Sequence, residues 1–152
     1  MHLKDFFSPD AINLQLRGGS KDDILAELVG LLRMDERSSG TLLRIIQRRE
    51  NLGSTGIGRG IAIPHGRVPA LHKIVTVFAR LDGAIDFEAL DDEPVDLIFL
   101  LLAPEHAGAD HLKALARISR LLREPSSIEK LRASKDRAAI YSVLTESAAH
   151  AA

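Results

Sequence analysis

The apolar run from Leu97 to Ala103 is the feature that most constrains how this chain can fold. It is the longest apolar run in the sequence, yet it is far shorter than the about 20 residues that span a bilayer. A short run without polar alternation is typical of a strand that is buried on both faces. Ile74 to Ala79 is a second apolar and β-branched run, which predicts another central strand. A sheet with such strands needs helices on both faces.

The segments around these runs show helix-like and strand-like patterns in turn. Ser20 is a good N-cap for an amphipathic helix that reaches about Arg33, because Asp22 and Asp23 follow in its first turn. The other expected elements are a half-buried strand at 11–16, a helix from near Ser39, a short strand Ile61 to Ile63 stopped by Pro64, a short edge strand Ala84 to Phe87, a helix through Leu112 and Leu122 closed by Pro125, and helices at 126–133 and 136–146. Together they predict an α/β domain whose sheet is covered by helices on both faces.

Composition limits the domain organisation and the classes of function. The 152 residues predict one domain, at 1–147, followed by a flexible tail at 148–152. A net charge of -1 and an aromatic content of 4% argue against a nucleic-acid partner, which needs a basic excess or stacking platforms. The absence of cysteine excludes disulfides and thiolate metal sites. The N-terminus lacks an apolar signal region, so we expect a cytoplasmic protein that is not inserted in a membrane.

His65 has the surroundings of a reactive residue. It follows the expected strand Ile61 to Ile63, Pro64 is expected to end the ladder there, and Gly66 lets the backbone turn and approach a ligand. Reactive groups of open α/β sheets commonly lie at such strand ends. The glycine-rich segment before the strand does not match a Walker A loop or a dinucleotide fingerprint, but its amides could cradle an oxyanion. The alternative is a polar residue that closes a strand behind a flexible turn.

Three other polar residues are candidates for the same site. Arg49 continues the apolar stripe of the second helix just before the turn at Gly53, so it can point towards whatever that turn builds; its alternative role is a cation at a helix C-terminus. Glu50 is slightly unfavourable at that end of a helix, which suggests a pairing or orienting role. His111 lies in the first turn of the third helix, where it could instead cap the helix or be exposed.

Two stretches of the chain together resemble the signature of a known family. They are RRENLGSTGIG at 48–58 with GIAIPHG at 60–66, and HLxxLAxISRLL at 111–122. The chain is similar over nearly its whole length to the type-2 enzyme IIA domain of the bacterial phosphoenolpyruvate-dependent phosphotransferase system. This is the fructose, mannitol and nitrogen-regulatory class. The resemblance implies a single-domain three-layer sandwich with a mixed sheet of about five strands.

The resemblance also implies a function and the residues that perform it. His65 matches the family's phosphoryl acceptor, which forms a phosphohistidine intermediate. Arg49 and His111 match supporting active-site residues, and Ser54 and Thr55 match a hydroxyl pair. The donor would be a histidine-containing phosphocarrier protein, charged by an enzyme I that uses phosphoenolpyruvate.

The chemistry of transfer between two imidazoles fits these residues. The acceptor needs a neutral ring nitrogen in line with the leaving nitrogen, and donors around the equatorial oxygens of the phosphoryl group. Arg49 can supply a forked pair of N–H groups and His111 one more. We expect a backbone carbonyl or a carboxylate to hold the other nitrogen of His65 and fix its tautomer. This chemistry needs no cofactor, and the sequence offers no metal site.

Three alternatives remain open. Within the family, the nitrogen-regulatory branch is favoured by the amino-acid sequences of two segments, Leu3 to Gly19 and Ser54 to Gly66. It is also favoured by the lack of an attached membrane or IIB segment. Its phosphorylation state would signal to a potassium transporter or a sensor kinase; a sugar-specific IIA component would instead pass phosphate to a IIB domain. Outside this activity, the chain could be a non-catalytic interaction module. A metal-dependent hydrolase would need His65, His106 and His111, whose spacing matches no metal motif.

Overall fold

The computed structural model describes residues 7, 11–17, 19–69 and 71–150, with side chains up to Thr145. The strands in these ranges are β1 (Ile12–Leu16), β2 (Gly56–Gly58), β3 (Ile61–Ala62), β4 (His65–Val68), β5 (Val75–Ile85) and β6 (Val95–Pro104). The helices are α1 (Lys21–Gly30), α2 (Glu36–Leu52), α3 (Ala109–Leu121), α4 (Pro125–Ala133) and α5 (Arg137–His150). Among the described residues, no helix has both the length and the apolarity that crossing a bilayer requires.

One mixed sheet forms the middle of the molecule. Its strand order is β1-β5-β6-β3-β2, and β4 also pairs with β6. β5 and β6 are antiparallel, β1 is parallel to β5, and both β3 and β4 are parallel to β6. Ile61 lies opposite Leu97 and His65 opposite Leu101, so β3 and β4 keep one register along β6. The strands of the described residues thus occupy five positions, which confirms the expected mixed sheet of about five strands.

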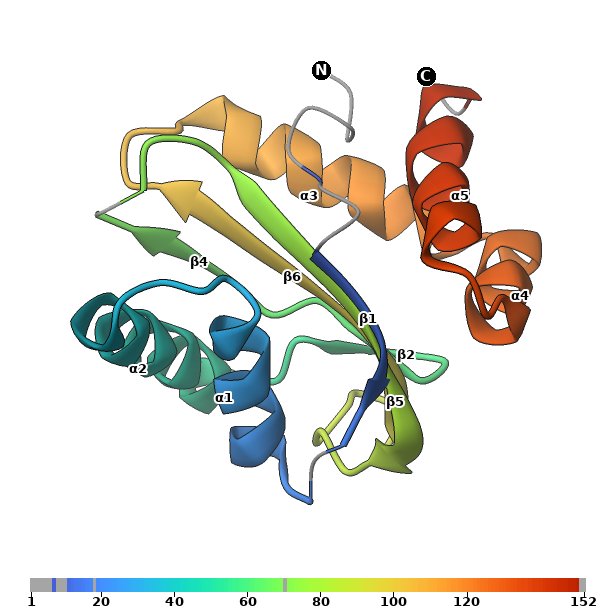
Figure 1. Ribbon diagram of the computed structural model, residues 1–152, viewed down its shortest axis with the longest axis horizontal. Coiled ribbons are helices and arrows are strands. Elements are labelled where there is room, and N and C mark those ends of the chain that lie inside the picture. The colour runs from blue at the N-terminus through green and yellow to red at the C-terminus, as the bar shows by residue number, and fades with distance from the viewer. Residues whose placement is uncertain (1–6, 8–10, 18, 70, 151–152) are drawn as a thin grey trace.

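Helices cover both faces of this sheet, with α1 and α2 on one side and α3, α4 and α5 on the other (Figure 1). Successive side chains of β6 alternate between two separate cores. The core under α3, α4 and α5 contains Leu97, Phe99, Leu101 and Ala103. The core under α1 and α2 contains Ile98, Leu100 and Leu102. This alternation explains why the run is apolar at every position, and it confirms the predicted three-layer fold.

Two predicted helix boundaries can be compared with the structure. Ser20 caps α1 as expected, since its side chain accepts a hydrogen bond from the Asp23 N–H. The second helix begins earlier than predicted, at Glu36 rather than near Ser39. Asp35 is its N-cap and accepts a 2.7 Å bond from the Ser38 N–H, a stronger start signal than the serine further on.

Pro64 does not end the sheet pairing, contrary to expectation. Proline lacks an N–H, but its carbonyl still accepts, and it takes a 2.9 Å hydrogen bond from the Leu101 N–H. Parallel pairing then resumes at His65, so the histidine begins a strand and does not close one.

Two other segments also differ from the prediction. Gly56–Gly58, where no strand is predicted, pairs with β3 and forms β2, so the alternative of a flexible turn is wrong for these residues. The expected separate edge strand at Ala84 to Phe87 is wrong, because β5 continues to Ile85, which lies opposite Val95. Phe87 lies beyond that strand and is fully buried.

The C-terminal end of the chain is only partly described. α5 continues to His150, beyond the predicted helix end at 146. Residues 151–152 of the expected tail lie outside the described residues. The domain boundary at 147 therefore stays a prediction.

Candidate active site

His65 is the first residue of β4 and its side chain is half-buried. Its Nδ1 lies 2.8 Å from the carbonyl oxygen of Ile63. A carbonyl can only accept, so Nδ1 must carry the proton in this contact. In the neutral ring, Nε2 then holds the lone pair and is the available nucleophile. The structure thus supplies the backbone carbonyl that the sequence predicted for fixing the tautomer.

His111 lies close to His65, in the first turn of α3. The two ring centroids are 6.0 Å apart, and the planes are tilted by 49°. His111 is only 6% exposed, so the alternative of a solvent-exposed residue is wrong. Its buried Nδ1 has no hydrogen-bond partner among the residues that the structure describes.

Burial and neighbouring charge favour the neutral form of His111. Desolvation lowers the pKa of His111 below its ordinary value, and repulsion from the protonated form of His65 and from Arg67 lowers it further. A neutral imidazole has one N–H donor and one acceptor nitrogen. His111 can therefore offer an N–H beside His65 without bringing a second positive charge into the site.

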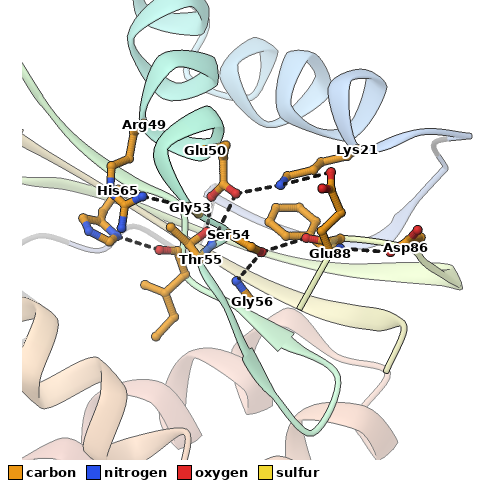
Figure 2. Close-up of polar contacts among 12 residues, drawn as sticks. Lys21, Arg49, Glu50, Gly53, Ser54, Thr55, Gly56, His65, Asp86 and Glu88 are labelled. Atoms are coloured by element: carbon orange, nitrogen blue, oxygen red, sulfur yellow. Dashed lines mark hydrogen bonds and ion pairs between the residues drawn. The ribbon is translucent and has the colours of Figure 1, made fainter. Parts of the chain in front are cut away.

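Arg49 reaches the site from the last turn of α2. Its Nη1 donates a 2.8 Å hydrogen bond to the Gly53 carbonyl, which ties the guanidinium across the turn at the end of the helix. Figure 2 shows the side chain extending from α2 towards His65. A guanidinium has five N–H donors, and this contact uses one of them. The structure brings together the three residues predicted to be catalytic: His65, Arg49 and His111.

Glu50 and Thr55 form a buried pair behind His65. Glu50 is 6% exposed and Thr55 is 5% exposed. The Thr55 N–H donates to Oε2 of Glu50 over 3.2 Å, and the Thr55 hydroxyl donates to Oε1. The same carboxylate forms an ion pair with Lys21, in which Nζ and Oε2 are 2.8 Å apart. Glu50 and Thr55, two of the four predicted supporting residues (with Ser54 and Gly66), therefore bind each other through these polar groups.

Ser54 holds the same loop from its other side. Its hydroxyl donates a 2.7 Å hydrogen bond to the Phe87 carbonyl and accepts a 3.0 Å bond from the Gly56 N–H. Gly56 itself packs against Ala89, where an added Cβ would lie 2.8 Å from the alanine Cβ. The predicted supporting residue Ser54 thus anchors the loop to the segment after β5.

Gly66, the last predicted supporting residue, lies where α2 approaches β4. A Cβ added at Gly66 would lie 3.3 Å from Cγ2 of Ile45. This is tighter than an ordinary van der Waals contact, so Ile45 on α2 would have to shift by a few tenths of an ångström to make room for a side chain there. The glycine therefore allows the helix that carries Arg49 to pack close to the strand that carries His65.

Two other histidines of the chain are exposed to solvent. His72 and His106 are both exposed on loops. Across the part of the chain that the structure describes, no group of three histidine, cysteine or acidic side chains is close enough to hold a metal ion. His106 therefore does not join the two histidines of the site.

The sequence prediction missed Lys21, which pairs with Glu50 from another helix. A signal for it was present, because Lys21 is the first residue of α1, immediately after the N-cap Ser20. The helix dipole disfavours a cation at this end. A lysine in such a place, followed by two aspartates in the same turn, indicates a partner elsewhere in the fold.

Comparisons with known proteins identify the family to which the chain is similar. The family described as phosphoenolpyruvate-dependent sugar phosphotransferase system, EIIA 2, matches residues 5–147. A nitrogen regulatory protein of Bradyrhizobium diazoefficiens is 52% identical over 95% of both chains. A fructose-specific EIIA component of Haloferax volcanii is 35% identical over 90% of both chains. The crystal structure of nitrogen regulatory protein IIA-Ntr from Neisseria meningitidis superposes with a TM-score of 0.88 at 32% identity, covering 94% of this chain and 99% of that one.

Proposed function

This chain belongs to the EIIA 2 family of the phosphoenolpyruvate-dependent sugar phosphotransferase system, and we propose that it carries a phosphoryl group on Nε2 of His65. The observation that carries the proposal is the 2.8 Å contact between Nδ1 of His65 and the Ile63 carbonyl. That contact leaves the lone pair on Nε2 and fixes the ring in the orientation from which Nε2 can attack.

The proposed step is a phosphoryl transfer between two imidazoles. The N–P bond of the donor's phosphohistidine breaks, and its electron pair stays on the donor nitrogen. A new bond forms between phosphorus and Nε2 of His65, while the proton on Nδ1 stays in place. The phosphorylated ring gains positive charge, which the Ile63 carbonyl stabilises by accepting from Nδ1.

Arg49 and His111 stabilise the phosphoryl oxygens in this proposal. Negative charge collects on the three equatorial oxygens of the phosphoryl group during transfer. Preorganised N–H donors stabilise this charge and so lower the activation barrier. Arg49 is held at the site by its bond to Gly53, so little side-chain entropy is lost when it binds an oxygen. His111 adds a neutral donor 6.0 Å, centroid to centroid, from the ring that reacts.

The proposed biological role is regulatory. The 52% identity to a nitrogen regulatory protein supports it. The donor would be a histidine-containing phosphocarrier protein, and the phosphorylation state would control binding to a regulated protein such as a potassium transporter or a sensor kinase. A second role is favoured by the 35% identity to a fructose-specific component. In that role the phosphoryl group would pass on to a IIB domain.

Intact-protein mass spectrometry tests the phosphoryl-carrier function. The chain is incubated with enzyme I, the phosphocarrier protein and phosphoenolpyruvate, and the wild type is compared with His65→Ala and His72→Ala. We expect one acid-labile phosphoryl group on the wild type and on His72→Ala, whose exposed histidine lies outside the site. His65→Ala should fold and stay unlabelled. An unlabelled wild type would refute the proposal and leave an interaction module as the better account.

A further inference from the structure

Lys21 is held in an unusual environment for a lysine. Its side chain is only 16% exposed, and its Nζ lies 2.8 Å from the carboxylate of Glu50, whose side chain is 3% exposed. The same Nζ lies 4.6 Å from the centroid of the Phe87 ring and 4.0 Å from the exposed carboxylate of Glu88. Lys21 also begins α1, where the helix dipole disfavours a cation. Desolvation and the helix dipole therefore both oppose a charged ammonium at this position, yet Lys21 lies there in contact with Glu50.

A continuous series of contacts leads from this ion pair to the reactive ring. Figure 2 shows Lys21, Glu50 and Thr55 at one end of the series and His65 at the other. Glu50 accepts from both the N–H and the hydroxyl of Thr55. The Thr55 carbonyl accepts a 3.0 Å hydrogen bond from the Ile63 N–H. The Ile63 carbonyl in turn accepts from Nδ1 of His65 over 2.8 Å. The carboxylate thus holds Thr55, the Thr55 backbone holds that of Ile63, and the Ile63 carbonyl holds the histidine ring.

We propose that Lys21 is a positioning residue, which holds the Glu50 carboxylate so that Thr55 and Ile63 keep His65 in the tautomer with the proton on Nδ1. Lys21 does not touch the phosphoryl group; it acts through Glu50 and the two backbone segments. The consequence for the transfer rate rests on the proposed function, whereas the consequence for the tautomer does not.

A purely stabilising role explains the ion pair less well. Burying an ammonium and a carboxylate costs desolvation free energy that their attraction only partly offsets, so such pairs contribute little net stability. Glu50 without Lys21 would be a buried carboxylate with no cation. The loop of Thr55 would relax to let water reach it, and the Ile63 carbonyl would lose its fixed place. Both tautomers of His65 would then be populated.

The test compares Lys21→Met, Lys21→Arg and Lys130→Met. Methionine keeps most of the length of the lysine and removes the charge, whereas arginine keeps a cation for Glu50. Lys130 is exposed on α4, so Lys130→Met is the matched control that removes one positive charge away from the site. Two properties are measured for each variant. Long-range proton–nitrogen NMR at mildly alkaline pH shows which ring nitrogen of His65 carries the proton, and a labelling assay gives the rate of phosphoryl transfer from the phosphocarrier protein.

We expect Lys21→Met to mix the two tautomers of His65 and to slow labelling by at least about tenfold, the lower end of what the loss of an orienting partner costs. Lys21→Arg and Lys130→Met should both show the His65 tautomer and the labelling rate of the wild type. Should Lys21→Met not fold, Lys21→Gln, which keeps a donor but no charge, is measured in the same way with the same expectation.

A folded charge-removing variant at Lys21 with the tautomer and rate of the wild type would overturn the positioning role while leaving the proposed function intact. An unlabelled wild type would instead refute the proposed function, and the NMR readout would still decide the role of Lys21. A drop in stability with an unchanged tautomer would show that the ion pair is structural only.

Discussion

Replacing Thr55 with valine removes one hydroxyl from the buried pair behind His65 and keeps the shape of the side chain. The Thr55 hydroxyl donates to a carboxylate oxygen of Glu50, and both residues are about as buried as core residues, at 5% and 6% exposed. A hydrogen bond to a charged group contributes about 1.5–3 kcal/mol. The methyl group of valine regains about 0.8 kcal/mol by apolar burial. The free energy of unfolding should therefore fall by about 1–2 kcal/mol.

Urea unfolding measured side by side for two threonine variants tests this value. Thr41 is the control, because its hydroxyl donates to the Arg37 carbonyl on the exposed face of α2. Threonine and valine have similar helix propensities, so Thr41→Val should change the free energy of unfolding by less than about 0.5 kcal/mol. In a chain of this size, Thr55→Val should also lower the Tm by roughly 2–8 °C. Equal effects of the two substitutions would refute the reasoning that Glu50 depends on this buried donor.

Three further predictions concern the rest of the site and its support. Arg49→Lys should fold but accept the phosphoryl group about 10–1000-fold more slowly, because an ammonium cannot reproduce the forked donors; a wild-type labelling rate in quench-flow would remove Arg49 from the mechanism. The folded-state pKa of His111 is lowered, so between the folded and unfolded pKa values the unfolded chain binds a proton that the folded chain does not. The contribution of His111 to stability is therefore complete above the unfolded pKa of about 6.5 and is lost as the pH falls through the folded pKa. The pH dependence of urea unfolding should be flatter in His111→Gln in that range, and an unchanged slope would contradict the assignment. Gly56→Ala should lower the free energy of unfolding by about 1–3 kcal/mol, since the added Cβ would lie 2.8 Å from that of Ala89. A Cβ added at Gly83 has no atom of the described residues within 4 Å, so Gly83→Ala should show no such clash-driven loss in thermal unfolding.

The part of the fold that could be predicted is the part set by apolar side chains. β6 was expected because every position from Leu97 to Ala103 faces one of two cores. β2 was not expected, because Gly56–Gly58 has no alternating pattern, and its extended form depends on pairing with β3. β4 was missed because Pro64 suggested an end to pairing, whereas its carbonyl keeps the strand beside β6. Contacts made by backbone groups leave little trace in the pattern of side chains.

The same distinction applies to the site. His65, Arg49 and His111 were predicted from local patterns and family resemblance, and the structure places them together. The residues that orient them were harder to assign. Glu50 and Thr55 were expected near the phosphate. The Glu50 carboxylate instead binds Thr55 and pairs with Lys21, which lies in a different helix. A pairing between positions so far apart in the chain depends on how α1 and α2 pack, which no local pattern encodes.

The most direct test of the account is to find which ring nitrogen carries phosphorus. The chain is labelled with nitrogen-15 in its histidines, phosphorylated by the phosphocarrier protein, and observed by NMR for scalar coupling between phosphorus and a ring nitrogen. We predict coupling to Nε2 of His65, with the proton retained on Nδ1 beside the Ile63 carbonyl. Coupling to Nδ1 of His65, or to a ring nitrogen of any other histidine, would contradict the account.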